Sequence, residues 1–427
     1  MPDNPQQTKD FVQVFQNALG YTPIEHSFAK EAGKQLSITR PPGTKNELWK
    51  NTPVTDVLKE SYSPSSIGEI SAIDRFSFET HSTRIVFVNG KYVSALSSGQ
   101  LPDGLEIIPL ADAITNHGKL LNEHLWRASA SHTNYFTLLN TAVMNEGVVV
   151  SIAPKAQLED AVEFIFLTDG QSVAANVRNL LVAGDGSKAR VINASHTING
   201  RAFTNAVTEI SLSHNSTIDY LLVQNEGMNS RQVNAMYVCQ DEGSHFNALT
   251  LTIGGGLIRN DLYVELNGIG AETELNGLFL CKGRQHVDNH THIDHQFSRC
   301  NSRELYKGVM DERSTAVFNG KVYVWPDAQK TNAFQSNRNI LLSAHSGVFS
   351  KPELEIYADD VKCSHGSATG KLDEESVFYL RSRGIPDQLA TKMLVRAFAE
   401  EITGNIKNPE NKKAVDKLLD AWFHRTP

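Results

Sequence analysis

Between residues 145 and 370 the chain repeats one pattern, a short run of apolar and β-branched residues that Gly, Asn or Asp closes. No amphipathic window of helical length separates these runs, which argues against strand–helix–strand units. A series this long fits a sandwich, a propeller or a parallel β-helix. We favour a parallel β-helix, because the corners are rich in Ser, Asn and Gly and no propeller repeat signature is present. The runs include Val148–Val150, Ala189–Ile192, Glu209–Leu212, Thr217–Val223, Ala248–Ile253, Asp261–Leu266 and Leu275–Leu280.

The segment before this region combines helices with a hairpin. Apolar residues within Phe11–Leu19 recur at helical spacing. Arg84–Val93 predicts a short β-hairpin, in which Asn89-Gly90 supplies the positive φ angles of a tight turn. We therefore expect residues 1–140 to form a mixed helical region that precedes a β-helix core over residues 141–370.

The last part of the chain is helical in pattern. Acidic residues in Asp373–Glu375 lie in the first turn of a predicted helix, where the helix dipole favours negative charge, and Gly384 ends that helix. Pro386 begins a second helix and Asn408 caps a third. Residues 371–427 are therefore expected to form a C-terminal helical domain, of a kind that closes a solenoid end or docks a partner.

Composition and motifs exclude several functions. The formal net charge of −8 and an isoelectric point near 6.0 argue against nucleic acid as a partner. Gly366–Leu372 is one residue short of a phosphate-binding loop and has Leu in place of the magnesium-binding hydroxyl, so the chain itself is not expected to hydrolyse ATP. Four cysteines without a CxxC pair, no signal-peptide pattern and no bilayer-spanning apolar stretch predict a cytoplasmic protein that does not associate with membranes.

A dense run, His286–His295, contains four imidazoles and two carboxylates. On a strand, alternate residues share one face, which places His290 beside His292. A metal site is therefore one interpretation of the run. The other is structural, with polar side chains hydrogen-bonded in ladders between successive coils. We favour the structural interpretation, because the run matches none of the spacings of known zinc sites.

A second group consists of Cys363 and His365. Two residues apart on an extended segment, they share one face. A thiolate and an imidazole can together bind a soft metal, and the histidine is expected to lower the pKa of the cysteine. From spacing alone, a structural cysteine beside a surface histidine is the simpler interpretation. The remaining cysteines are isolated and are expected to be small core residues: Cys239, Cys281 and Cys300.

Several longer stretches carry more information as a set than any motif does alone. They are Leu354–Gly366, Leu372–Glu375 and Phe378–Ile385, with Asp288–Thr291, Phe318–Lys321, Ala328–Ala333 and Asn337–Ser343 upstream. In this order they resemble the SufB/SufD family of iron–sulfur cluster assembly proteins. The Lys-Cys-Ser-His-Gly stretch, followed by Phe-Tyr-Leu-Arg-Ser-Arg-Gly, is more similar to the SufD branch of that family than to the SufB branch.

The resemblance implies a mainly β fold, a right-handed parallel β-helix between a helical N-terminal region and a C-terminal helical domain. It also implies a non-enzymatic scaffold subunit of a SufB–SufC–SufD complex that assembles iron–sulfur clusters. Such a subunit pairs with a SufB-like subunit through the β-helix and docks a SufC-like ABC ATPase through its C-terminal helices. The implied docking residues are Phe378, Tyr379, Arg381 and Arg383.

By motif match, His365 is the metal-binding residue of a transient iron–sulfur cluster at the SufB interface, and Cys363 is a weaker candidate. Thiolates hold iron, and an imidazole ligand raises the potential of a cluster, so a site with one imidazole is suited to release. No tightly bound cofactor is expected. The solenoid edges also permit a homodimer when the chain is isolated.

Two alternatives from other classes stay open at this stage. A β-helix polysaccharide hydrolase or lyase would need paired carboxylates, for which Asp288 and Asp294 are the candidates. A stand-alone metalloprotein would bind its metal through the histidine run, at His286, His290, His292 and His295.

Overall fold

The computed structural model describes residues 5–21, 26–63, 70 and 72–424. Residues 1–4 and 425–427, which belong to the first and last predicted regions, lie outside the described residues. The helices are α1 (Pro5–Leu19), α2 (Ser27–Ile38), α3 (Thr55–Lys59), α4 (Leu110–Asn116), α5 (Gly118–His124), α6 (Ala128–Ser131), α7 (Tyr135–Ala142), α8 (Glu374–Ser382), α9 (Asp387–Thr403) and α10 (Pro409–His424), with short 3-10 helices η1 (Glu47–Trp49), η2 (Ile73–Phe76) and η3 (Ser94–Leu96). The strands are β1 (Ser82–Val88), β2 (Lys91–Tyr92), β3 (Leu105–Pro109), β4 (Val148–Ile152), β5 (Ala161–Ala183), β6 (Lys188–Leu212), β7 (Thr217–Asn225), β8 (Arg231–Gln240), β9 (His245–Thr252), β10 (Leu257–Leu266), β11 (Glu272–Cys281), β12 (His286–His295), β13 (Asn301–Met310), β14 (Thr315–Val324), β15 (Asn332–Leu341), β16 (Gly347–Ile356) and β17 (Lys362–Gly370).

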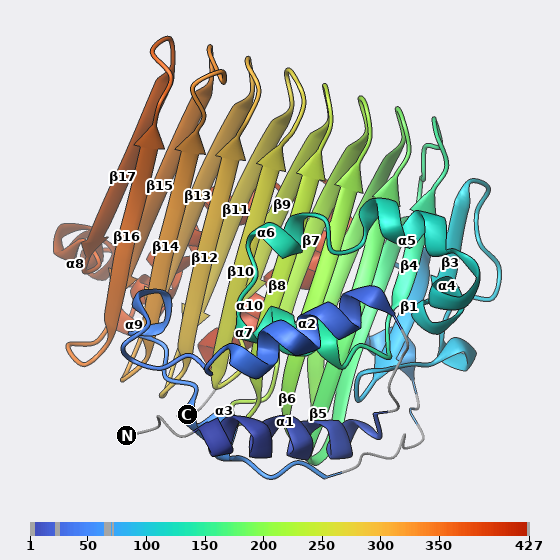
Figure 1. Cartoon of the computed structure of the whole chain (residues 1–427). Coiled ribbons are helices and arrows are strands. Elements are labelled where there is room, and N and C mark those ends of the chain that lie inside the picture. The colour runs from blue at the N-terminus through green and yellow to red at the C-terminus, as the bar shows by residue number, and fades with distance from the viewer. Residues whose placement is uncertain (1–4, 22–25, 64–69, 71, 425–427) are drawn as a thin grey trace.

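The strands form a parallel solenoid with two sheets (Figure 1). Successive strands alternate between the sheets. We call the sheet with β8, β10, β12, β14 and β16 the even sheet, and the sheet with β7, β9, β11, β13, β15 and β17 the odd sheet. The long strands β5 and β6 take part in both. The parallel β-helix predicted from the recurring short runs is therefore confirmed.

Adjacent coils are held in register by the sequence spacing. His286, for example, lies beside Thr315 of the next coil, 29 residues later. Alternate side chains of every strand point inward, and those of Val287, Ile293 and Tyr306 belong to one apolar core between the sheets. Gly277 leaves room for the neighbouring coil, because a Cβ at this position would lie 2.2 Å from the ring of Tyr306.

The N-terminal helices cover the outside of the even sheet (Figure 1). They meet it in an aromatic cluster, in which the ring of Phe203 on β6 lies 5.7 Å from that of Phe15 on α1 and 5.9 Å from that of Phe136 on α7. Offset and edge-on aromatic contacts of this kind stabilise a packed interface beyond the area they bury. The N-terminal region is thus fixed on the solenoid.

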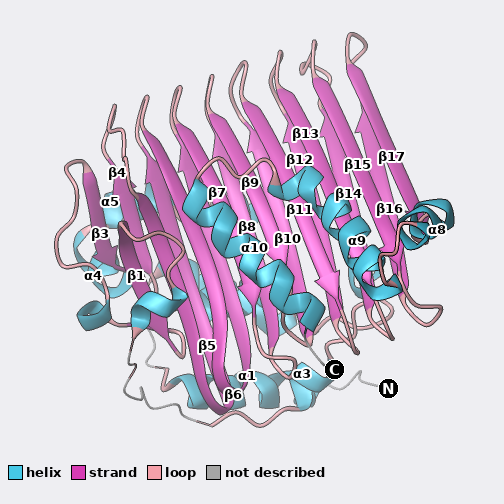
Figure 2. Ribbon diagram, turned by 180° about the vertical axis from the view of Figure 1, so that it is seen from behind, coloured by secondary structure: helices cyan, strands magenta, loops and turns pink. Residues whose placement is uncertain are grey.

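Helices α9 and α10 cover the odd sheet on the opposite side (Figure 2). Their buried residues, including Val395, Ile402 and Trp422, pack against outward apolar residues of the odd sheet. The ammonium group of Lys307 on β13 donates a hydrogen bond to the carbonyl of Phe398 at 2.6 Å and pairs with Glu401 at 2.7 Å. The coils of the solenoid are therefore held between two helical layers.

The predicted local elements are also present. The hairpin between β1 and β2 turns at Asn89 and Gly90, whose φ angles are 52° and 78°. Asp373 caps α8 by accepting a hydrogen bond from the backbone of Ser376, and Gly384, with φ 83°, follows its end. These residues set the boundaries through local geometry, which explains why the sequence pattern located them.

One edge of the odd sheet is closed by the short strand β2, which pairs with the end of β1, and by side chains. On β1, the backbone N–H of Arg84 donates to the hydroxyl of Ser98 at 2.9 Å, and that of Val86 donates to the hydroxyl of Ser97 at 3.0 Å.

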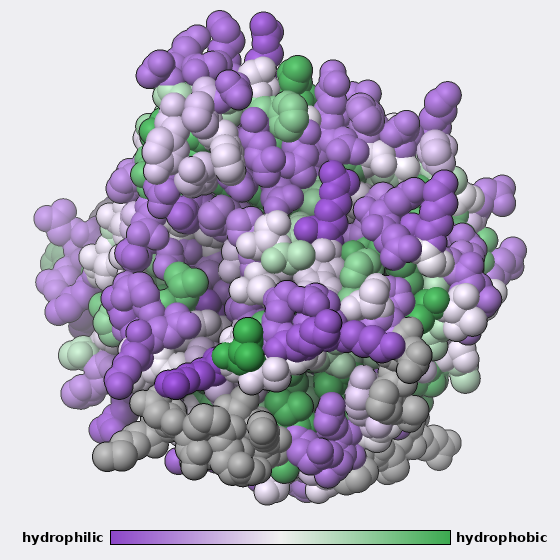
Figure 3. All heavy atoms as spheres, in the orientation of Figure 1, coloured by the Kyte–Doolittle hydropathy of each residue, from purple (hydrophilic) through white to green (hydrophobic). Residues whose placement is uncertain are grey.

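Hydrophilic side chains predominate on the face of the molecule shown in Figure 3. In the described part of the chain, no helix is both long and apolar enough to cross a membrane.

Candidate functional site

The solenoid has an open end at its last coil, formed by β16 and β17 (Figure 1). Within the described residues, β16 pairs with β14 and β17 with β15, and neither pairs with a further strand. Every residue of β17 except Cys363 is exposed. Large apolar side chains are exposed on the same coil, with Phe349 at 52% and Tyr357 at 56%. An open strand edge beside exposed aromatic residues is a typical surface for pairing with another chain.

Strand β17 places Cys363 and His365 on one face, as their spacing predicts. In the sheet, Cys363 lies beside Ala333 of β15 and His365 lies beside Gln335. Both positions therefore belong to rows of side chains that point into the solenoid. Cys363 is half-buried against the core, whereas His365 is exposed. Burial raises the pKa of the Cys363 thiol. The expected lowering of this pKa by the histidine was therefore wrong, because partial desolvation disfavours the thiolate.

A buried polar column continues beneath His365. In the coils below, Gln335 Nε2 donates to Glu304 Oε2 at 2.7 Å. Glu304 is 3% exposed, and burial raises its pKa to about 7 although Thr291 and Gln335 hydrogen-bond to it. The strand pattern contained one signal for this group, a charged residue at an inward position of β13. Sequence reasoning did not use it.

Helix α8 lies beside the last coil and carries the predicted docking residues (Figures 1 and 2). Phe378 and Tyr379 are 72% and 58% exposed. The guanidinium group of Arg383 lies 5.3 Å from the ring centroid of Tyr379, and Arg381 is exposed on the same helix. All four predicted docking residues are therefore exposed, on α8 or directly after it, and Arg383 lies near Tyr379.

The histidine run forms β12 in the even sheet. Three of its histidines have separate partners, His286 with Thr315 at 2.7 Å, His290 with Asp288 at 2.9 Å and His295 with Ser302 at 2.8 Å. The His286 contact and the 3.0 Å bond between Asn260 and Asn289 join successive coils, as the structural interpretation predicted. The four histidines do not converge, so these residues do not form the metal site of the alternative metalloprotein interpretation.

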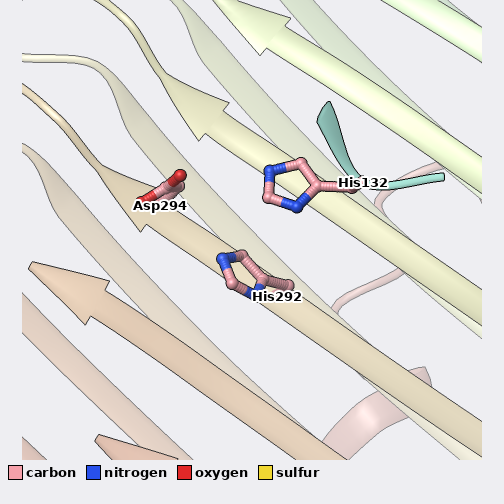
Figure 4. A group of neighbouring side chains, drawn as sticks. All are labelled: His132, His292 and Asp294. Carbon is pink, nitrogen blue, oxygen red and sulfur yellow. The ribbon is translucent and has the colours of Figure 1, made fainter. Parts of the chain in front are cut away.

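His292 is the member of the run with a different environment. It lies beside Asp294 and beside His132, which follows α6 (Figure 4). One ligand atom from each of these three side chains lies within 4.8 Å of the others. Sequence reasoning missed this group, because His132 belongs to the N-terminal region and no local spacing connects it with β12.

The carboxylates Asp288 and Asp294 cannot act as a pair. They lie six residues apart on the outer face of one strand, which is about 20 Å, whereas glycosidase carboxylates lie about 5 to 10 Å apart. Asp288 is also buried beneath Thr52 and paired with Arg259 at 2.7 Å. Burial alone would raise its pKa, but Arg259 and His290 lower it by more. These residues therefore do not provide the hydrolase or lyase site.

Two further features lie apart from the last coil. Cys239, Cys281 and Cys300 are buried, as predicted for small core residues. A cavity of about 380 Å³ lies between the odd sheet and the connection from α9 to α10, with Arg190, Asp219 and Glu274 in its lining. Asn247, between the two carboxylates, donates to Asp219 at 2.8 Å. The cavity is lined by residues outside β16 and β17 and is separate from the open end.

Comparison with known proteins identifies the family. The model of the SUF system FeS cluster assembly SufBD core domain matches residues 166–398, and that of the SufBD protein N-terminal region matches residues 20–164. This chain belongs to the SufBD family. The iron–sulfur cluster assembly protein SufD of Escherichia coli is 32% identical over 91% of this chain and 90% of its own length. A SufBD family iron–sulfur cluster assembly protein of Synechocystis sp. is 30% identical over 88% and 86%, and the chloroplastic protein ABCI7 of Arabidopsis thaliana is 28% identical over 89% and 82%.

SufBD membership confirms the resemblance that the C-terminal stretches indicated. The chain is an iron–sulfur cluster assembly protein of the SufD type at the level of its family. The two matches together span the solenoid and much of the helical regions that hold it. His365 and Cys363 lie inside the core-domain match, on strand β17, where His365 is exposed and Cys363 is half-buried.

Proposed function

We propose that this SufBD family protein is a non-catalytic scaffold subunit, which pairs with a SufB-like subunit and docks a SufC-like ABC ATPase during iron–sulfur cluster assembly. The observation that carries the proposal is the open end of the solenoid, where β17 holds His365 and its outer edge pairs with no strand among the residues that the structure describes. Membership of the SufBD family supports a role in iron–sulfur cluster assembly, and the exposed strand edge supports the binding of a partner chain.

Pairing would occur by strand addition at the last coil. The outer N–H and C=O groups of an edge strand bind a second strand without any change in the first. Ser364, Gly366 and Ala368 are small, so they allow the partner's backbone to approach β17. Phe349 and Tyr357 would be covered by the same contact. Since a second copy of this chain has the same edge, a homodimer forms by the same geometry when the SufB-like subunit is absent.

The cluster is cargo at this interface and not a resident cofactor. His365 is exposed and can ligate iron together with thiolates of a partner. The raised pKa of Cys363 makes its thiolate scarce until a metal or a partner lowers that pKa. His365 is therefore the first ligand from this chain, and Cys363 is the second.

The ATPase would dock on α8 and the start of α9. Phe378 and Tyr379 on α8 are exposed apolar side chains, as are Leu389 and Met393 on α9, at 47% and 43%, and the two helices lie against each other. Arg381 is exposed on α8 and suits a partner groove with an acidic rim. Because α8 begins four residues after β17 ends, movement of the docked ATPase would reach the strand that holds His365.

Co-purification with SufB-like and SufC-like partners tests the pairing and the ligand role. The tagged native chain and His365→Ala should both form the complex, and only the native chain should support an iron–sulfur enzyme in cells. His345→Ala, at an exposed histidine in the turn before β16, is the matched control and should behave as the native chain does. Absence of the complex with the native chain would refute the pairing, and full activity of His365→Ala would refute the ligand role.

Docking is tested with Phe378→Ala combined with Tyr379→Ala. This variant should lose the ATPase and keep the SufB-like subunit. Ile38→Ala on α2, at a residue 84% exposed and distant in sequence from α8, is the control for loss of an exposed apolar side chain. Retention of the ATPase by the double variant would refute α8 as the docking surface.

Coupling is tested by a crosslink that holds α9 on the solenoid. Arg338 on β15 and Glu401 on α9 form an exposed ion pair at 3.2 Å. Arg338→Cys and Glu401→Cys, joined by a short bismaleimide, should block assembly while both partners stay bound, whereas the same variant without the crosslinker, which lacks the Lys307–Glu401 pair as well, should still assemble. Unimpaired assembly in the crosslinked complex would show that movement of α9 is not needed.

A further inference from the structure

A group of two imidazoles and one carboxylate lies on the outer face of the even sheet, at β12, two coils before the last strand of that sheet, β16 (Figure 4). Strand β12 contributes His292 and Asp294, which are two residues apart and therefore share a face. His132, at the end of α6, lies over them. Its ring centroid is 4.9 Å from that of His292, and the ligand atoms of all three residues lie within 4.8 Å of one another.

The side chains of this group are held by a second layer of contacts. His132 Nε2 lies 3.5 Å from Glu265 Oε1, and Trp325 Nε1 donates to Asp294 Oδ1 at 2.7 Å. The imidazole of His132 also stacks on the ring of Tyr263, with 5.0 Å between centroids. Metal-binding histidines commonly have a carboxylate at their second ring nitrogen, and metal-binding carboxylates accept further hydrogen bonds.

The charges around the group favour a cation. Asp294 and Glu265 bring two carboxylates to it, and the imidazoles are neutral when they act as ligands. Lys321 is the neighbour of His292 in the next coil, but its ammonium group pairs with Glu355 at 2.7 Å. The side chain of His132 is 20% exposed, so an ion can enter from solvent, while Asp294 is buried.

We propose that His132, His292 and Asp294 bind a divalent first-row transition-metal ion. Two imidazoles and one carboxylate with the remaining positions open to water are a donor set for ferrous iron, and zinc accepts the same ligands. Ligand atoms around such an ion lie about 3 to 4 Å apart, so the side chains need to close by about 1 Å. The bound ion joins the connection between α6 and α7 to β12.

The test uses the full-length chain, made metal-free, in a Cys363→Ser, His365→Ala background. This background removes the other candidate ligands, so the outcome is independent of the proposed function. Fe²⁺ under anaerobic conditions and Zn²⁺ in a separate series are titrated by calorimetry, and the melting temperature is followed with and without each ion. One ion per chain and a higher melting temperature are expected for at least one of the two metals.

Variants locate the binding. His132→Gln, His292→Gln and Asp294→Asn should each weaken binding at least tenfold, with circular dichroism of each variant used to check the fold. His214→Gln is the matched control, because His214 is an exposed histidine 3.7 Å from Asp185 and should leave binding unchanged. The proposal is overturned if neither ion binds at one per chain, or if all three variants bind as tightly as the control does.

Discussion

The buried carboxyl group of Glu304 predicts a measurable pH dependence of stability. Burial raises its pKa from 4.5 to about 7. Since the pKa of Glu304 is higher in the folded chain than in the unfolded chain, its contribution to the free energy of unfolding is complete below pH 4.5 and is lost as the pH rises through 7. A difference of about 2.5 units corresponds to about 3 kcal/mol, because one unit is about 1.4 kcal/mol. Glu304→Gln removes the titration and keeps an acceptor for Gln335 Nε2.

Urea denaturation of the native chain and of Glu304→Gln at pH 4.5, 6 and 8 measures this effect. The free energy of unfolding of the variant, relative to the native chain, should rise by about 3 kcal/mol between pH 4.5 and pH 8. Glu106→Gln, at an exposed position on β3, should show no such rise. The reasoning would be refuted if the difference in free energy of unfolding between the native chain and Glu304→Gln changed by less than about 1 kcal/mol over this pH range.

Three further predictions concern stability. Asp288→Asn should lower the free energy of unfolding by about 2 to 4 kcal/mol in urea denaturation, because Arg259 stays buried with a single carboxylate, Asp261. Asp74→Asn, at an exposed partner of Arg84, should lower it by less than about 1 kcal/mol, and equal losses would contradict the reasoning. Gly277→Ala should destabilise by about 1 to 3 kcal/mol in thermal unfolding, since its Cβ meets the ring of Tyr306, and Gly366→Ala, with nothing within 4 Å, should be near neutral; a neutral Gly277→Ala would refute the steric argument. Burial lowers the pKa of His295 from 6.5 to about 3. The free energy of unfolding of the native chain should therefore fall by about 3 kcal/mol more than that of His295→Gln between pH 7 and pH 4. Parallel curves of this free energy against pH for the two proteins would contradict the prediction.

The fold was predictable because its determinants are local and repeated. Alternating apolar residues in short runs indicated strands, and Asn89-Gly90, Asp373 and Gly384 marked turns and helix ends through their own backbone preferences. The lack of helices between the runs argued against strand–helix–strand units, and the Ser-, Asn- and Gly-rich corners favoured a parallel β-helix over a sandwich or a propeller. The position of Cys363 beside His365 also followed from strand geometry, which needs a spacing of two residues and nothing else.

The environment of the candidate sites was not predictable in the same way. The pKa of Cys363 depends on the coil beneath it, and the column of Glu304 and Gln335 depends on the length of each turn, which sets the register between coils. His132 meets His292 because the N-terminal region folds back over the even sheet. Contacts of this kind join residues from separate elements, and no local spacing encodes them.

The two edges of the odd sheet differ in a way that limits the size of any assembly. At β1 the hydroxyl groups of Ser97 and Ser98 accept hydrogen bonds from backbone donors, while no strand in the described part of the chain pairs with the outer edge of β17. A solenoid with adhesive edges at both ends would add copies without limit and grow into a fibre. If strand addition at β17 joins two copies, the covered β1 ends then face outward and offer this sheet no further edge for growth. Ser97, Ser98 and β2 thus protect the solenoid from growth into a fibre.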